Sequence, residues 1–88
     1  MLKIERATDG DLVTFTLSGQ IEEEQVAELG ALFDRGADGH NLVLDLQEVR
    51  LVDREAVRFL ARYEAQGARL VHCPAYIREW IVRVRNQP

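Results

Sequence analysis

The sequence feature that most constrains the fold is the run Leu42-Val43-Leu44-Asp45-Leu46, in which only one residue is not apolar. A short and nearly unbroken apolar run favours a central strand that is covered on both faces over an edge strand. Strand patterns also occur at residues 2–6, residues 12–18 and residues 69–72, where apolar and polar side chains alternate or β-formers cluster. The apolar run is therefore expected to be the core strand of a sheet.

Three further segments have the apolar spacing of amphipathic helices. They are residues 22–35, residues 54–66, and a last helix that begins near Pro74. The residue Asp53 is placed as the N-cap of the second of these helices, its carboxylate accepting from the amide of Glu55 or Ala56.

The connections between these segments fix the fold class. The turn residues Thr8-Asp9-Gly10-Asp11 join the first two strands into a hairpin, and each strand-helix-strand unit makes a right-handed parallel crossover. The sequence therefore predicts an α/β fold for one domain over residues 1–88. Its order is β-β-α-β-α-β-α, with about three helices and a mixed four-stranded sheet in which an N-terminal hairpin adjoins parallel strands.

Two finer expectations concern element ends and burial. Gly19 is expected to end the second strand, and the stretch from Gly36 to Gly39 is expected to stop the first helix. On the last helix, Ile77, Ile81 and Val84 are expected to form a buried stripe, with Tyr76 and Trp80 beside them as core anchors.

Composition narrows the function classes. The formal net charge of −4 argues against a nucleic-acid surface, which needs a concentrated basic face. No apolar segment approaches the length of a membrane span, and the N-terminus lacks the pattern of a secretory signal, so a soluble cytoplasmic chain with no direct membrane insertion is expected. Cys73 has no second cysteine to pair with, and with His40 and His72 it forms no spaced ligand set, so neither a disulfide nor a metal site is expected.

Several stretches of the sequence resemble a STAS domain of the anti-sigma-factor-antagonist type, from about Leu2 to Val84. In that resemblance a glycine closes the second strand, an apolar strand ends in Asp and is followed by a capping Asp, and a glycine leads the last core strand. The matching stretches are Leu17-Ser18-Gly19-Gln20-Ile21, Val43-Leu44-Asp45-Leu46 with Val49 and Val52-Asp53, and Gly67-Ala68-Arg69-Leu70-Val71.

The phosphorylation motif of such domains is degenerate here. The resemblance implies Ser-Ser-Gly after the capping Asp, with the second Ser accepting phosphate, but this chain has Arg54-Glu55-Ala56. Glu55 is the phosphorylation-site equivalent and has no hydroxyl, so no phosphorylation is expected there. Three interpretations stay open: Glu55 is a helix-start carboxylate that pairs with Arg58, a mimic of phosphoserine, or the result of drift at an unread site.

The resemblance implies a protein-binding regulatory module that is not an enzyme and carries no cofactor. Its expected partner-binding surface consists of Asp53, Arg54, Glu55 and Arg58, and its expected partner is a kinase-like anti-sigma factor or another regulatory protein. The alternative is a small STAS subunit of a membrane-transport complex, bound to a transporter component. A third class, an enzyme or small-ligand binder, rests only on Asp45 and Asp53, and a homodimer is also open.

Overall fold

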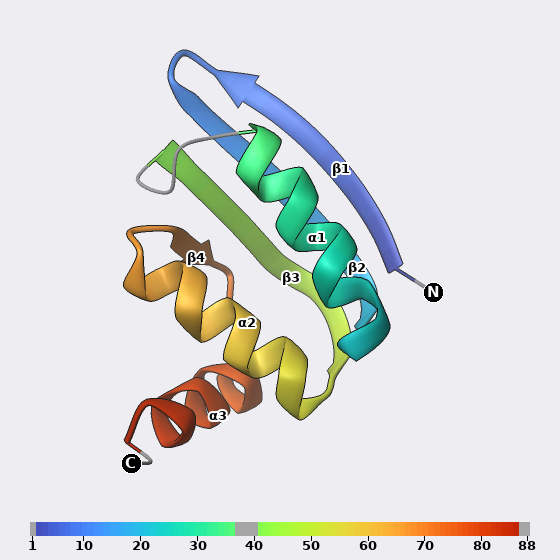
Figure 1. Ribbon diagram of the computed structural model, residues 1–88, viewed down its shortest axis with the longest axis vertical. Coiled ribbons are helices and arrows are strands. Elements are labelled where there is room, and N and C mark those ends of the chain that lie inside the picture. Colours follow the sequence, from blue (N-terminus) through green and yellow to red (C-terminus); the bar gives the residue numbers. More distant parts are fainter. Residues whose placement is uncertain (1, 37–40, 87–88) are drawn as a thin grey trace.

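The computed structural model describes residues 2–36 and 41–86 (Figure 1). The predicted order of elements, the three helices and the mixed four-stranded sheet are all confirmed. Residues 37–39, which were expected to help stop the first helix, and His40 lie outside the described residues. The elements are β1 (Leu2–Asp9), β2 (Leu12–Ile21), α1 (Glu23–Gly36), β3 (Leu42–Val52), α2 (Arg54–Ala65), β4 (Arg69–Val71) and α3 (Ala75–Asn86).

The strands lie side by side in the order β1-β2-β3-β4. The hairpin of β1 and β2 is antiparallel, and its turn uses Gly10 at a φ of 60°, a conformation that glycine adopts without steric cost. The pairs β2–β3 and β3–β4 are parallel, as the crossover rule requires. The strand β4 pairs only with residues 43–45, so β3 continues beyond it.

The strands β2 and β3 are longer than their sequence patterns indicated. Gly19 does not end β2, because at a φ of 95° it accommodates a register shift, after which the strand resumes to Ile21. The strand β3 likewise does not end near Asp45: it runs on to Val52, which pairs with Ile21. The longer pairing brings the ends of β2 and β3 together at one edge of the sheet.

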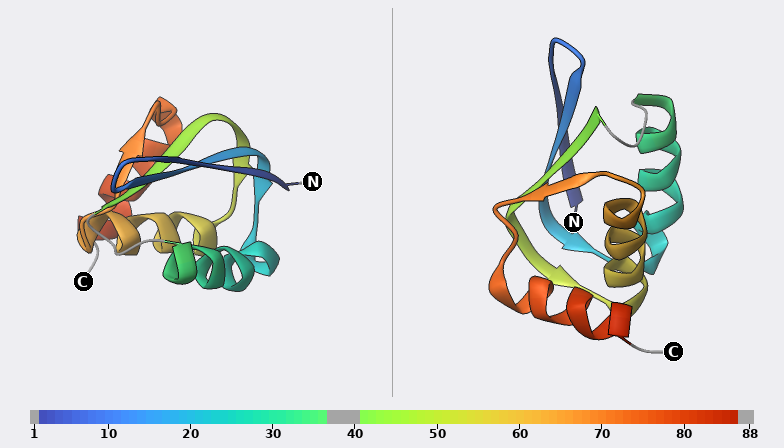
Figure 2. Two further views of the ribbon diagram at one scale, coloured as in Figure 1. Left: turned by 90° about the horizontal axis from the view of Figure 1, so that it is seen from above. Right: turned by 90° about the vertical axis from the view of Figure 1, so that its left-hand side faces the viewer.

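One face of the sheet carries the core. Leu42, Leu44 and Leu46 are at most 1% exposed, whereas Val43 and Asp45, which alternate with them, are only partly buried. Figure 2 shows the reason, since α1 and α2 lie together on one face of the sheet. The expectation that the core strand is covered on both faces was therefore wrong, although its place inside the sheet was predicted correctly.

Aromatic side chains hold α1 against α2 and the sheet. The ring centroid of Phe33 lies 4.9 Å from that of Phe15, 5.6 Å from that of Phe59 and 5.4 Å from that of Tyr63. The Tyr63 hydroxyl donates to Asp34 Oδ1 at 2.8 Å, and burial together with this hydrogen bond raises the pKa of Tyr63 to about 12. The contact joins the two helices by packing and by one polar anchor.

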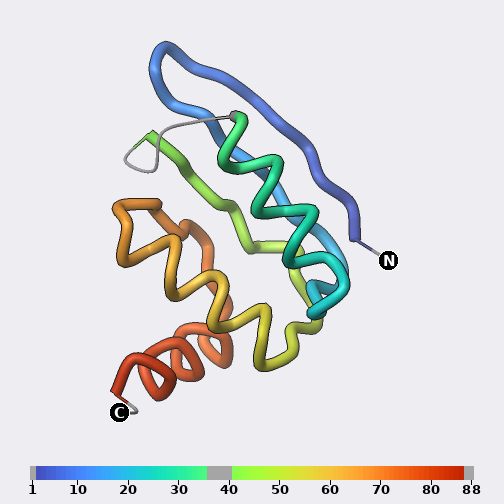
Figure 3. The backbone as a smooth tube through the Cα atoms, in the orientation of Figure 1, coloured from blue at the N-terminus to red at the C-terminus, as the bar shows by residue number. Residues whose placement is uncertain are grey.

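The last helix, α3, packs alongside α2 (Figures 1 and 3). Ile77 and Ile81 are fully buried, and Trp80 is partly buried against the core. Tyr76 is 46% exposed, so its prediction as a core anchor was wrong. Tyr76 begins a row with Trp80 and Val84, in which each residue is four positions after the one before. This row lies beside the buried stripe of α3, not within it.

Among the described residues, no helix combines the length and the apolar character needed to cross a membrane.

Candidate functional site

The predicted partner-binding residues all lie where β3 passes into α2. Asp53 is the N-cap of α2, and its Oδ1 accepts from the amide of Ala56 at 2.9 Å, one of the two bonds that the sequence predicted. This bond satisfies one of the amides that a helix start leaves without a partner. The helix start is therefore fixed by the residue that precedes it.

Asp53 has a second partner that the sequence did not indicate. Its Oδ2 accepts from the amide of Glu23, the first residue of α1, at 2.8 Å. In addition, the Asp53 amide donates to the Ile21 carbonyl at 3.3 Å. One carboxylate thus caps two helices, because β2 and β3 are parallel and end beside each other, so that α1 and α2 begin together (Figure 3).

Arg54, Glu55 and Arg58 are exposed on the first turns of α2. Arg58 Nη1 lies 3.6 Å from Glu55 Oε1, and their side chains are 47% and 49% exposed, respectively. This confirms the predicted pairing, but an exposed ion pair of this length is worth at most about 0.5 kcal/mol. Asp53 therefore fixes the backbone of this turn, and the charged side chains of the turn are exposed.

Glu55 has the expected position for either a structural or a regulatory carboxylate. It stands in the first turn of α2, where a negative charge interacts favourably with the helix dipole. The same position presents its carboxylate to solvent beside Arg58. The geometry is compatible with both interpretations of Glu55.

A hollow of about 260 Å³ adjoins this turn, between the start of α2 and the second half of α3. Four residues line it: Arg54, Trp80, Arg83 and Val84. Sequence reasoning missed this feature, because it exists only through the docking of α3 against α2. The aromatic residues of α3 were the one signal near it in the sequence, and they were expected to be core anchors.

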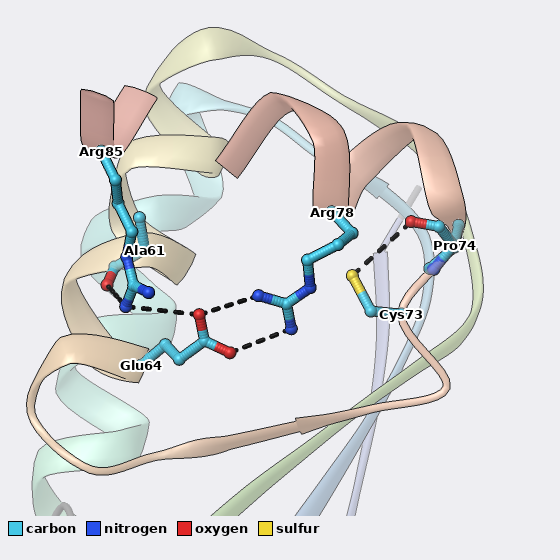
Figure 4. Close-up of polar contacts among 6 residues, drawn as sticks. All are labelled: Ala61, Glu64, Cys73, Pro74, Arg78 and Arg85. Atoms are coloured by element: carbon cyan, nitrogen blue, oxygen red, sulfur yellow. Dashed lines mark hydrogen bonds and ion pairs between the residues drawn. The ribbon is translucent and has the colours of Figure 1, made fainter. Parts of the chain in front are cut away.

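The other end of α2 has a different electrostatic arrangement (Figure 4). Glu64 accepts from Arg78 Nη1 and Nη2 of α3, both at 2.9 Å, and Arg85 Nη2 lies 3.3 Å from the same carboxylate. The hydrogen bonds from Arg78 lower the pKa of Glu64 and raise that of Arg78. This network, in which the Glu64 side chain is only 20% exposed, fastens α3 to α2.

The residues that suggested an enzyme are separated. Asp45 lies within β3, where its Oδ1 accepts from the Gln47 amide at 3.0 Å and lies 3.3 Å from His72 Nδ1. Asp53 follows the end of the same strand. Because Asp45 pairs with Thr16 and Val52 with Ile21, the two aspartates lie roughly 15–20 Å apart at the rise of an ordinary strand. The two carboxylates therefore do not form a pair that could share acid-base work.

Cys73 and the possible metal ligands were the other candidates for a chemical site. Cys73 is partly buried against the core, and burial raises the pKa of its thiol, which disfavours the reactive thiolate. In the described parts of the chain, residues 2–36 and 41–86, no group of three His, Cys, Asp or Glu side chains could hold a metal ion.

Neither a protein-family model nor a curated protein sequence matches the chain. Solved structures do match. The anti-sigma factor antagonist SpoIIAA in its unphosphorylated form has a TM-score of 0.64 at 14% sequence identity, and the match covers 99% of this chain and 100% of that one. The chain has the STAS fold.

Two further structures extend the comparison. The STAS domain of an antisigma-factor antagonist from Rhodobacter sphaeroides matches with a TM-score of 0.62 at 17% identity, over 81% of this chain and 86% of that one. The protein Mglu matches with a TM-score of 0.58 at 30% identity, over 81% of this chain but only 19% of its own length. The STAS resemblance found in the sequence is thus confirmed for the fold.

Proposed function

We propose that this chain is a protein-binding regulatory module of the anti-sigma-factor-antagonist type, which docks a kinase-like or other regulatory protein. The observation that carries the proposal is the first turn of α2, where Asp53 bonds to two helices and leaves Arg54, Glu55 and Arg58 exposed. The STAS fold supports it, because two of the matching structures are anti-sigma-factor antagonists.

The proposed mechanism is competitive docking without catalysis. The module occupies a regulatory partner and thereby releases another protein from it. It needs no cofactor and acts in the cytoplasm. Because Glu55 has no hydroxyl, the module is not switched by phosphorylation at this position, which separates it from STAS domains that carry a serine there.

The binding test uses the full chain and an ATPase-fold anti-sigma regulator from the same organism. Arg54→Glu and Arg58→Glu are each expected to weaken binding about tenfold, because each reverses a charge on the proposed surface. Arg69→Glu is the matched control, since it makes the same charge change on β4. Equal losses for all three variants, or none for the two α2 variants, would contradict the proposed surface.

The phosphorylation test compares the chain with Glu55→Ser. After incubation with the regulator and ATP, mass spectrometry of peptide 54–58 is expected to show no phosphate on the original chain. The serine variant is expected to accept phosphate, because the hydroxyl is restored at an exposed helix start. Phosphate elsewhere on the original chain would mean that the switch lies at another residue.

A further inference from the structure

The hollow between α2 and α3 has the dimensions of a side-chain pocket. Its volume of about 260 Å³ is smaller than the roughly 300–1,000 Å³ of ordinary small-molecule sites. One or two side chains of another protein would fill it. It opens beside Arg54, which also belongs to the proposed partner-binding surface.

In the part of the chain that the structure describes, the two arginines of the hollow form no ion pair. Within residues 2–36 and 41–86, no carboxylate lies within 4.0 Å of the side-chain nitrogens of Arg54 or Arg83. Arg78 and Arg85, on the same helix as Arg83, both engage Glu64. Two arginines of α3 thus pair with Glu64, whereas Arg83 pairs with no described carboxylate. The chain as a whole has a formal net charge of −4.

The rest of the hollow is apolar and firmly placed. Trp80 and Val84 are one helical turn apart on α3, and both pack against the hydrophobic core. Tyr76, one turn before Trp80, is 46% exposed and extends this row of apolar side chains beyond the hollow. An occupant would therefore meet guanidinium groups and an aromatic and aliphatic wall at the same time.

This combination favours a peptide segment over a small inorganic anion. One amide of the first turn of α2, that of Ala56, is already engaged by Asp53, so this helix start has one donor fewer for a phosphate. What the hollow does offer is two exposed arginines and an apolar wall, and only a ligand with both kinds of group uses both.

We propose that the hollow is the docking site for an acidic segment of a protein partner. An Asp or Glu side chain of that segment pairs with Arg54 and Arg83, and a neighbouring apolar side chain packs on Trp80 and Val84. The inference rests on the proposed function, because it specifies the chemistry of the partner that the first turn of α2 would meet.

The experiment uses Trp80, the only tryptophan of the chain, as the reporter. The full chain is titrated with a short synthetic peptide that alternates glutamate with leucine and phenylalanine, while tryptophan emission is recorded. A saturable emission change is expected. Replacing the glutamates by lysine, or the apolar residues by serine, is expected to weaken binding about tenfold, since each change removes one half of the recognition.

Variants of the chain locate the binding. Arg83→Glu and Arg54→Glu are expected to weaken the acidic peptide about tenfold, whereas Arg69→Glu on β4 is expected to change it less than about twofold. Arg83→Gln, which removes the charge without reversing it, serves if Arg83→Glu does not fold, as judged by circular dichroism.

Three results would overturn the proposal: no saturable emission change, equal binding of the serine-substituted peptide, or the same emission change with inorganic phosphate alone. Failure here is distinguishable from failure of the proposed function. If the anti-sigma regulator binds and Arg58→Glu weakens it while Arg83→Glu does not, the proposed function stands and the hollow is not used. If the peptide binds in the hollow but no regulator binds the chain, the hollow is a docking site and the proposed function fails.

Discussion

The two ends of α2 differ in what their charged side chains contact. At the C-terminal end, Glu64 receives two hydrogen bonds of 2.9 Å from Arg78 and a third contact from Arg85, all from α3. At the N-terminal end, Glu55 and Arg58 meet each other at 3.6 Å with nearly half of each side chain exposed. One end is joined to the fold, and the other faces solvent.

On one helix, the charged groups of one end stabilise the fold, whereas those of the other end are exposed to solvent. A bidentate pair that is mostly shielded from water stabilises the docking of two elements, whereas an exposed pair contributes little to stability. The N-terminal end nevertheless has a fixed backbone, because Asp53 accepts from the amide of Glu23 at the start of α1 and from that of Ala56 in the first turn of α2. A rigid backbone with exposed charges is the arrangement expected of a docking surface.

The largest effect is expected from removing the double cap. Asp53→Ala is predicted to lower the free energy of unfolding by about 2 kcal/mol, because it removes a cap from each of two helices and each cap is worth about 1 kcal/mol. Urea denaturation followed by circular dichroism measures it. A loss of about 1 kcal/mol or less would mean that the bond to Glu23 contributes nothing to stability.

A smaller loss of stability is expected from a change at the C-terminal end of α2. Glu64→Gln is predicted to cost about 1 kcal/mol, because Arg78 and Arg85 lose their common carboxylate in a partly shielded site. Glu79→Gln, which removes the same charge from an exposed position on α3, is the control and should cost less than about 0.5 kcal/mol. Equal costs for the two variants would contradict the structural role of Glu64.

The carboxylate of Glu64 should also make the free energy of unfolding depend on pH in the acid range. The pKa of Glu64 is lowered from its ordinary value of 4.5. Its contribution to stability is therefore complete above pH 4.5 and is lost as the pH falls towards the lower pKa of the folded state. Unfolding measured between pH 6 and pH 3, a range set around ordinary carboxyl pKa values of about 4, should therefore show a steeper loss for the original chain than for Glu64→Gln. Parallel curves would exclude Glu64 as the source.

The smallest effect is expected at the exposed pair. Glu55→Gln is predicted to change the free energy of unfolding by less than about 0.5 kcal/mol, since the ion pair with Arg58 is long and solvated. The same denaturation assay checks it. A cost equal to that of Glu64→Gln would remove the contrast between the two ends.

Local patterns in the sequence were sufficient for the order of elements and for the bond from Asp53 to Ala56, because each depends on residues close together in the chain. The bond from Asp53 to Glu23 could not be predicted, since it spans 30 residues and depends on how β2 and β3 pair. The register shift at Gly19 explains why β2 was expected to end too early.

The packing of α3 was the other feature that the sequence did not predict. Its apolar spacing predicted a buried stripe of Ile77, Ile81 and Val84. The two isoleucines are buried, but Val84 is only partly buried, and Tyr76 is exposed at the border of the stripe. Nor could spacing show that Arg78 meets Glu64 while Arg83 lines the hollow, because both outcomes depend on how α3 crosses α2.

The N-terminal end of α2 is the proposed docking surface, whereas the Glu64 end is structural. The most direct measurement is a map of amide chemical shifts in the ¹⁵N-labelled chain during titration with the anti-sigma regulator. The largest changes are expected at residues 53–58, with a second group at residues 80–84. Changes concentrated around Glu64 and Arg78, or along β1, would contradict the claim.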